Sequence, residues 1–257
     1  MNSLSKLVNL SFRINFLDFK NNYNELYRKL LYKNLMFCWC LIMSPNISVI
    51  LFDMDGVLTD SIDLWFNAVT TVFHRYFNEN PSREKFNKYL HKSTREMIRG
   101  IVDLSTPSSE LIDKLTAMVD GCFESEMIPK LQPIPNAENL IKDLYRRKYR
   151  LGVVTNGSET TSKKMIRHLG LIDYFEYIFG CNGEKPKPDP ALLLKALKQF
   201  NVEPEECVYI GDSYTDLLAS NKAEIHFIYY QNREIPEMVK YKGLKVTKLL
   251  DILLLMK

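Results

Sequence analysis

This sequence has few residues of the kinds that build transition-metal sites or disulfide frameworks. The chain of 257 residues contains five cysteines and four histidines. The cysteines have neither metal-ligand spacing nor an even-numbered disulfide pattern, and the histidines form no ligand pair. The pattern argues against a cysteine or histidine metal site and predicts free thiols in a reducing, cytoplasmic compartment.

Strong net charge and long apolar runs are also lacking. The net charge of +3 gives no reason to expect nucleic acid or another polyanion as a partner. The apolar segment at 35–43 is too short to span a bilayer, so we expect no stable association with a membrane. There are no repeats and no low-complexity tracts, and nothing in the sequence decides the oligomeric state.

The first part of the chain differs from the rest in charge. Residues 1–42 carry a net charge of +4, whereas the remainder sums to −1. The apolar segment comes late for a signal peptide, and no small-residue cleavage site follows it. Because Met43 opens the segment 43–48 that directly precedes the first predicted strand, we hypothesise that the native protein starts at Met43. The residues upstream of Met43, within an N-terminal extension that we bound at 1–45, would then be non-native or dispensable. Native peptides from 1–42, found by mass spectrometry, would contradict this.

The order of apolar patterns predicts an α/β protein with a helical insert. An apolar run at 49–52 is typical of a buried parallel strand, and helical spacing follows from Ser61, a potential helix cap, to about residue 130. After a proline-containing linker at 132–135, helices and strands alternate, which indicates a doubly wound parallel sheet. We therefore predict a Rossmann-like core from residues 46–60 and 133–257 and an all-helical cap at 61–132. The predicted later strands are 151–155, 177–180, 207–211 and 226–230. Each is preceded by a predicted helix, at 136–147, 159–169, 190–200 and 214–222 respectively.

Four short polar segments next to these apolar runs carry the functional signal. Ligands of doubly wound sheets bind beyond the carboxyl ends of the strands, so segments far apart in the sequence converge there. The segments are DMDGV at 53–57, VTNG at 154–157, KPKPD at 185–189 and GDSYTD at 211–216.

The first segment places two carboxylates two residues apart after a buried strand. Asp53, at the strand end, is a candidate nucleophile that would form an acyl phosphate with a phosphorylated substrate. Asp55 can protonate the leaving alcohol and then deprotonate water, and Gly56 allows a tight turn. An acidic turn or a calcium loop is the alternative, although no bidentate glutamate follows.

The second and third segments offer groups that bind phosphate. The Thr155 hydroxyl and the neighbouring backbone of Asn156 can contact phosphate oxygens next to a helix N-terminus, although this triplet is also a common turn. Lys185 is the candidate cation that would neutralise the nucleophile and the transferring phosphoryl oxygens. For Lys187 we favour a solvated surface position.

The fourth segment supplies carboxylates for a metal ion. Hard oxygen ligands suit Mg²⁺, which would relieve the repulsion between clustered carboxylates and a phosphate. Asp212 is the candidate direct ligand. Asp216 could bind through water, orient Lys185, or serve only as a carboxylate at the helix terminus.

Together, the four segments resemble the motifs of the haloacid dehalogenase superfamily of phosphatases and phosphomutases, over about residues 48–230. The resemblance implies Mg²⁺ held by Asp53, the backbone carbonyl of Asp55 and Asp212. The insert is similar to the cap of the phosphoglycolate phosphatase and β-phosphoglucomutase branch, and the acid at Asp55 favours phosphoryl transfer over carbon–halogen cleavage. In the cap, HKSTRE at 91–96 is similar to a substrate loop, from which Arg95 could reach a distal anionic group or remain solvated.

One departure from the family pattern and the choice among three functions remain open. Relatives usually carry Ala-Gly after the fourth motif, whereas this chain has Ala223 and Glu224, which leaves the geometry of that turn undecided. We predict a Mg²⁺-dependent phosphatase that hydrolyses small phosphorylated metabolites through an aspartyl-phosphate intermediate. The alternatives are a phosphomutase of the β-phosphoglucomutase type and a non-catalytic phosphate-binding protein. The intact carboxylates and lysine argue against the last.

Overall fold

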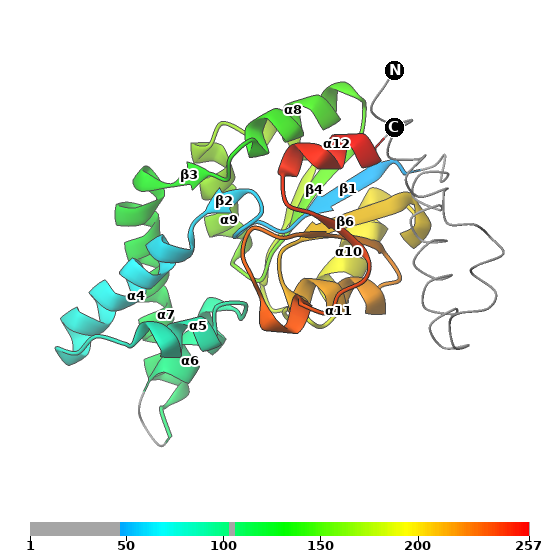
Figure 1. Cartoon of the computed structure of the whole chain (residues 1–257). Coiled ribbons are helices and arrows are strands. Elements are labelled where there is room, and N and C mark those ends of the chain that lie inside the picture. Colours follow the sequence, from blue (N-terminus) through cyan, green and yellow to red (C-terminus); the bar gives the residue numbers. More distant parts are fainter. Residues whose placement is uncertain (1–46, 103–105, 257) are drawn as a thin grey trace, which may run out of the picture. The chain divides into compact units, whose positions relative to one another are not determined.

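The core of the protein is a single parallel sheet. The computed structural model describes residues 47–102 and 106–256, so the hypothesis on Met43 and the extension at 1–45 lies outside the described residues. Six strands lie in the order β5-β4-β1-β6-β7-β8, and each neighbouring pair runs parallel (Figure 1). This confirms the predicted parallel α/β core. The strands are β1 Val49–Phe52, β4 Arg150–Val154, β5 Tyr177–Phe179, β6 Cys207–Gly211, β7 His226–Tyr230 and β8 Leu244–Val246.

Strand β1 lies inside the sheet, and its side chains are apolar on both faces. All four of its residues are fully buried, and the strand pairs with β4 on one side and with β6 on the other. After β1 the chain moves outward through β4 to β5, and then returns to β6 and moves outward in the opposite direction. The winding therefore reverses between β1 and β6, where doubly wound sheets bind their ligands. Asp53 and Asp212 directly follow these two strands.

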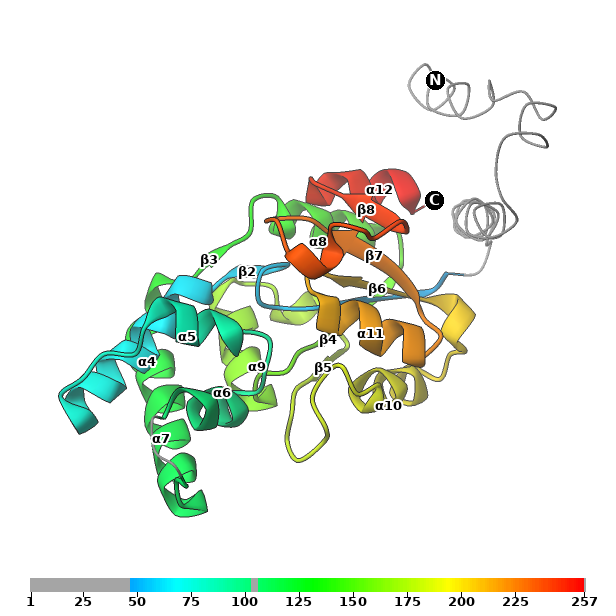
Figure 2. The same cartoon turned by 60° about the horizontal axis from the view of Figure 1, so that its bottom comes forward.

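Helices cover both faces of the sheet. Apolar residues of α10 pack with one face of β1, β4 and β6 in a continuous core that also includes residues of α11. Helices α8 and α12 contact each other on the opposite side of the sheet (Figure 1), and Figure 2 shows the same layers from below. None of the helices in the described ranges is both long and apolar enough to cross a membrane. The core helices are α8 Ala137–Arg146, α9 Glu159–His168, α10 Ala191–Phe200, α11 Tyr214–Lys222 and α12 Ile252–Leu255.

Between β1 and α8, the chain forms a helical segment whose two ends pair with each other. Strand β2, Thr59–Asp60, pairs antiparallel with β3, Gln132–Pro133, within what the sequence predicted to be a linker. The pairing brings the entry and exit of the segment together. Between them lie α4 Ile62–Phe77, α5 Arg83–Lys88, α6 Thr94–Ile101, α7 Ser109–Cys122, the π-helical turn Phe123–Met127 and the 3-10 turn Ile128–Lys130.

Two features differ from the sequence-based expectation. Ser61 precedes α4, but its side chain makes no capping hydrogen bond; the hydroxyl donates to Asp55 instead. The sequence also failed to predict β8 and α12. Both are short, and β8 owes its strand conformation to pairing with β7, which local sequence patterns do not reveal.

The turn after α11 keeps a left-handed backbone although a glutamate occupies it. Glu224 has a φ angle of +58°. We expect Glu224→Gly to raise the free energy of unfolding by about 0.5–1 kcal/mol, because relief of the left-handed strain exceeds the extra entropy of glycine in the unfolded chain. Urea denaturation measures the change. Glu224→Ala keeps a Cβ atom and serves as the control, so equal stabilisation by both variants would contradict the strain argument.

Candidate active site

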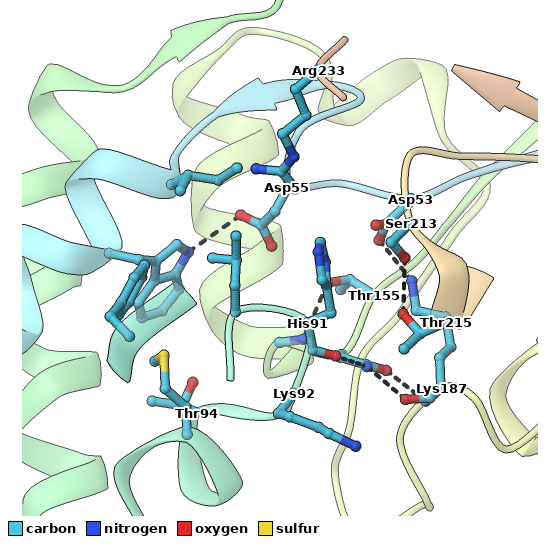
Figure 3. A pocket seen from close by; sticks show the side chains of 17 residues that line it. Asp53, Asp55, His91, Lys92, Thr94, Thr155, Lys187, Ser213, Thr215 and Arg233 are labelled. Atoms are coloured by element: carbon cyan, nitrogen blue, oxygen red, sulfur yellow. Dashed lines mark hydrogen bonds and ion pairs between the residues drawn. The ribbon is translucent and has the colours of Figure 1, made fainter. Parts of the chain in front are cut away.

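A buried lysine joins two carboxylates at the centre of the site (Figure 3). The ammonium of Lys187 donates to Asp53 Oδ1 at 2.8 Å and to Asp216 Oδ1 at 2.7 Å, and its side chain is only 2% exposed. The Tyr209 hydroxyl at 2.7 Å and the Val154 carbonyl at 3.2 Å also accept from it. Burial alone would lower the pKa of Lys187, but the attraction of Asp216 and Asp53 outweighs burial and raises it. Lys187 is therefore a cation.

The structure corrects the choice between the two lysines of the third segment. Lys185 is exposed, whereas Lys187, expected to be solvated, occupies the site. The cause lies in the backbone: Lys187 N–H donates to Asn156 Oδ1 at 2.7 Å, and the Lys187 carbonyl accepts from Asn156 Nδ2 at 3.0 Å. This pair of bonds holds the loop so that Lys187 points inward.

Asp216 positions Lys187 through a fully occupied carboxylate. Its Oδ1 accepts from Lys187 and from the Tyr209 hydroxyl at 2.8 Å, and its Oδ2 accepts from the Ser213 N–H at 3.0 Å and from the Ser213 hydroxyl. Burial would raise the pKa of Asp216, but Lys187 outweighs burial and lowers it. Of the roles that the sequence left open, orientation of a lysine fits best, with Lys187 in place of Lys185.

Asp212, by contrast, has an unused oxygen. It is fully buried, and its Oδ1 has no hydrogen-bond partner in the described part of the chain. Its Oδ2 accepts from Asn232 Nδ2 and Arg233 Nη2, each at 3.3 Å. Burial raises the pKa of Asp212 to about 7, although Arg233 opposes the shift. Gly56, with φ +85°, faces this carboxylate so closely that a Cβ atom would lie 2.2 Å from Oδ2.

Asp55 lies at the boundary between the sheet and the helical segment. Its Oδ1 accepts from the Ser61 hydroxyl and from Trp65 Nε1 at 3.2 Å. Burial raises the pKa of Asp55, and these two hydrogen bonds oppose the shift. The indole of Trp65 in turn stacks on Phe123, with ring centroids 3.6 Å apart. The proposed acid is thus held by side chains at the start of the helical segment.

The second segment lines the pocket, and its Asn156 also connects two neighbouring loops by hydrogen bonds. Thr155 is buried, and its hydroxyl accepts from the Gly157 N–H at 3.1 Å while lining the pocket. Asn156 also lines the pocket, but its amide is committed to protein groups. Besides the backbone of Lys187, Asn156 Nδ2 contacts the His91 carbonyl at 2.8 Å. Asn156 therefore ties the loop before α6 to the loop that carries Lys187.

Arg95, the predicted substrate ligand of the helical segment, points elsewhere. Its guanidinium donates to Asp113 Oδ1 at 2.6 Å and to the Ser109 hydroxyl at 2.8 Å, both in α7, and it does not line the pocket. In the described structure Arg95 therefore lies outside the pocket lining, because an acidic neighbour on the next helix satisfies the guanidinium.

The pocket contains polar residues that the sequence analysis did not select. It has a volume of about 60 Å³, enough for roughly four to six waters. His91, Lys92 and Thr94 line it from the helical segment, and Ser213, Thr215 and Arg233 line it from the core (Figure 3). Ser213 and Thr215 lie within the fourth polar segment, 211–216, and His91, Lys92 and Thr94 lie within 91–96, the stretch that is similar to a substrate loop. Arg233 follows β7 in a loop without a recognisable pattern, so only the fold reveals its position.

The donor set fits a divalent metal ion. Asp53, Asp212 and Asp216 each offer an oxygen within 4.8 Å of the others, and all three are buried. Carboxylate oxygens are the ligands that hard divalent cations prefer. The unpartnered Oδ1 of Asp212 is an independent indication, because a buried acceptor without a donor is costly unless something binds it. The backbone carbonyl of Asp55 stays a predicted ligand.

Comparisons with known proteins agree with this geometry. A family model described as haloacid dehalogenase-like hydrolase matches residues 50–230. The phosphoglycolate phosphatase of Nitrosospira multiformis is 25% identical over 202 residues, which cover 75% of this chain and 88% of that protein. The β-phosphoglucomutase structure of Clostridium difficile covers 80% of this chain and 93% of its own, with a TM-score of 0.70 at 22% identity.

A third comparison concerns a structure with a ligand. CbbY of Rhodobacter sphaeroides in complex with xylulose-1,5-bisphosphate covers 79% of this chain and 95% of its own, with a TM-score of 0.72 at 21% identity. At such identities the two structures show a shared fold. Since the family model covers well over half of this chain, the protein belongs to the haloacid dehalogenase-like hydrolases, in the part of that family that contains the phosphatases it resembles.

Proposed function

We propose that this hydrolase is a Mg²⁺-dependent phosphatase of small phosphorylated metabolites and that it works through an aspartyl-phosphate intermediate. The contact of Asp53 with Lys187, beside two further carboxylates and in the pocket that Asp55 also lines, is the observation that carries the proposal. The names of relatives make phosphoglycolate the first substrate to test, and the bisphosphate complex of CbbY supports a small phosphorylated substrate. The free thiols of Cys122, Cys181 and Cys207 support a cytoplasmic location.

In the proposed reaction, Asp53 is the nucleophile and Asp55 the acid and base. An oxygen of Asp53 forms a bond to phosphorus while the bond from phosphorus to the ester oxygen breaks, and Asp55 gives its proton to the departing oxygen. Water then attacks phosphorus and gives a proton to Asp55. The bond between Asp53 and phosphorus breaks, so free phosphate is released and both carboxyl groups return to their first state.

The other groups of the site neutralise negative charge and orient the reacting groups. Lys187 offsets the charge of Asp53 and of the phosphoryl oxygens, and Thr155 offers a hydroxyl to them. Asp53 and Asp212 would hold the metal, with Asp216 at most bound through water because its oxygens already accept protein hydrogen bonds. When bound, Mg²⁺ supplies Lewis-acid and charge-neutralising chemistry.

The helical segment at 61–132 is proposed to act as a cap over the substrate. His91 and Lys92 line the same pocket as Asp53, and Trp65 contacts Asp55 from α4. A cap that closes over the small pocket would exclude bulk water while the acyl phosphate forms.

A phosphate-release screen tests the proposal. With Mg²⁺ present, we expect the purified full chain to release phosphate from phosphoglycolate or from another small phosphomonoester in a panel. EDTA should abolish release, and excess Mg²⁺ should restore it, because the carboxylate cluster is then neutralised again. Interconversion of hexose phosphate isomers without net phosphate release would instead favour a phosphomutase. Phosphate binding without either reaction would favour a non-catalytic protein.

A further inference from the structure

The pocket contains cations that the proposed chemistry at phosphorus does not use. Lys187 is committed to Asp53 and Asp216, but Arg233 and Lys92 line the same pocket from the core and from the helical segment. His91, between them in Figure 3, is a third basic side chain. Burial and the nearby Arg233 lower the pKa of His91 to about 4, so its imidazole is neutral at pH 7. Arg233 and Lys92 are therefore the available positive charges.

Most N–H donors of the Arg233 guanidinium have no protein partner in the described ranges. Its side chain is 30% exposed, and its guanidinium makes one polar contact within the described ranges, from Nη2 to Asp212 Oδ2 at 3.3 Å. A guanidinium carries five N–H donors in a planar fork that matches the two oxygens of a carboxylate or a phosphate. Most of this fork is left for a ligand in the pocket that Arg233 lines.

Arg233 lies close enough to the reacting centre to meet a second anionic group of a small substrate. It contacts Asp212, one of the three carboxylates whose oxygens lie within 4.8 Å of one another around the reacting centre. In Figure 3 its side chain enters from the opposite side to Lys92 and extends toward Asp55 and His91. Because Asp53 and Arg233 line the same pocket, a second anionic group on a small substrate bound there would lie near this guanidinium.

We propose that Arg233 is a specificity-determining residue that recognises a second anionic group of the substrate, a task that the sequence assigned to Arg95. The inference rests on the proposed function only in that the substrate bears a phosphoryl group. Lys92 adds positive potential from the cap side of the pocket, with a smaller effect because it is exposed to solvent. Arg95 takes no part, since Asp113 and Ser109 occupy its guanidinium.

A pair of non-hydrolysable ligands tests the inference without turnover. 3-Phosphonopropionate and propylphosphonate have the same phosphonate and chain length, but only the first ends in a carboxylate. In calorimetric titrations with Mg²⁺, we expect the wild-type chain to bind 3-phosphonopropionate about 10- to 100-fold more tightly, as a charge-assisted hydrogen bond implies. Arg233→Gln should abolish most of this preference for 3-phosphonopropionate. Arg233→Lys should show an intermediate preference, because it retains the charge but not the planar fork of N–H donors.

The ratio separates recognition from other roles of Arg233. Loss of the contact with Asp212 would weaken the binding of both ligands by the same factor, and this factor cancels in the ratio of their affinities. Arg95→Gln is the matched control and should retain the wild-type ratio. The inference is overturned if the wild type shows no preference, if Arg233→Gln keeps it, or if Arg95→Gln loses it. Absence of phosphate release in the separate screen would contradict the proposed function alone.

Discussion

Replacing Lys187 by methionine is expected to abolish turnover and to lower the free energy of unfolding by about 3–5 kcal/mol. The substitution removes the ammonium that contacts Asp53 at 2.8 Å and Asp216 at 2.7 Å, and it leaves both carboxylates buried without that partner. Burial and repulsion by Asp216 already raise the pKa of Asp53, and loss of Lys187 raises it further. A protonated Asp53 is a poor nucleophile, so we expect kcat to fall by about 10³-fold or more.

Lys185→Met is the matched control for this prediction. Lys185 lies two residues away on the same loop, but its side chain is exposed. We expect a change in stability within about 0.5 kcal/mol and little change in turnover. Urea denaturation and steady-state phosphate release measure both quantities. A larger loss in Lys185→Met than in Lys187→Met would reinstate the choice made from the sequence.

A second variant separates the structural from the chemical role of Lys187. Adding Asp216→Asn to Lys187→Met removes one buried carboxylate together with the cation. We expect the double variant to recover part of the lost stability, because the two residues interact directly and their effects are not additive. Turnover should stay abolished. Recovery of activity together with stability would mean that Lys187 only supports the fold.

Asp53→Asn is expected to lower kcat by at least about 10⁴-fold while the protein stays folded, as removal of a nucleophile does in other covalent enzymes. The amide nearly matches the carboxylate in shape, and it removes a charge whose burial is unfavourable. We therefore expect the melting temperature to change by only a few degrees. Phosphate release from the best substrate of the screen and thermal unfolding provide the measurements.

Asp55→Asn distinguishes the acid from the nucleophile. An activated ester such as p-nitrophenyl phosphate needs no proton for its leaving group, so this variant should still transfer the phosphoryl group to Asp53. Hydrolysis of the intermediate needs the base, and stopped-flow absorbance should therefore show a burst of p-nitrophenolate followed by slow turnover. Asp53→Asn should show no burst. A burst in Asp53→Asn would exclude Asp53 as the nucleophile.

Much of the core could be predicted because its signals are local. The apolar run of β1 is buried on both faces, and it reads as a parallel strand without knowledge of its neighbours. In a parallel sheet the residue after each strand lies at one common edge, so the sequence alone predicts that Asp53 and Asp212 lie close together. Short β8 had no such signal because its conformation depends on β7.

The sequence by itself determined five of the six strands of the sheet and that Asp53 lies near the Asp212 and Asp216 segment at its edge, since strand patterns and winding order are sufficient for both. Only the tertiary structure decided which cations face the pocket. Lys187 enters because Asn156 holds its backbone, and Arg95 is absent because Asp113 binds it. Arg233 lines the pocket from a loop after β7. These choices depend on partners distant in sequence, and a side chain's charge alone does not say which partner it reaches.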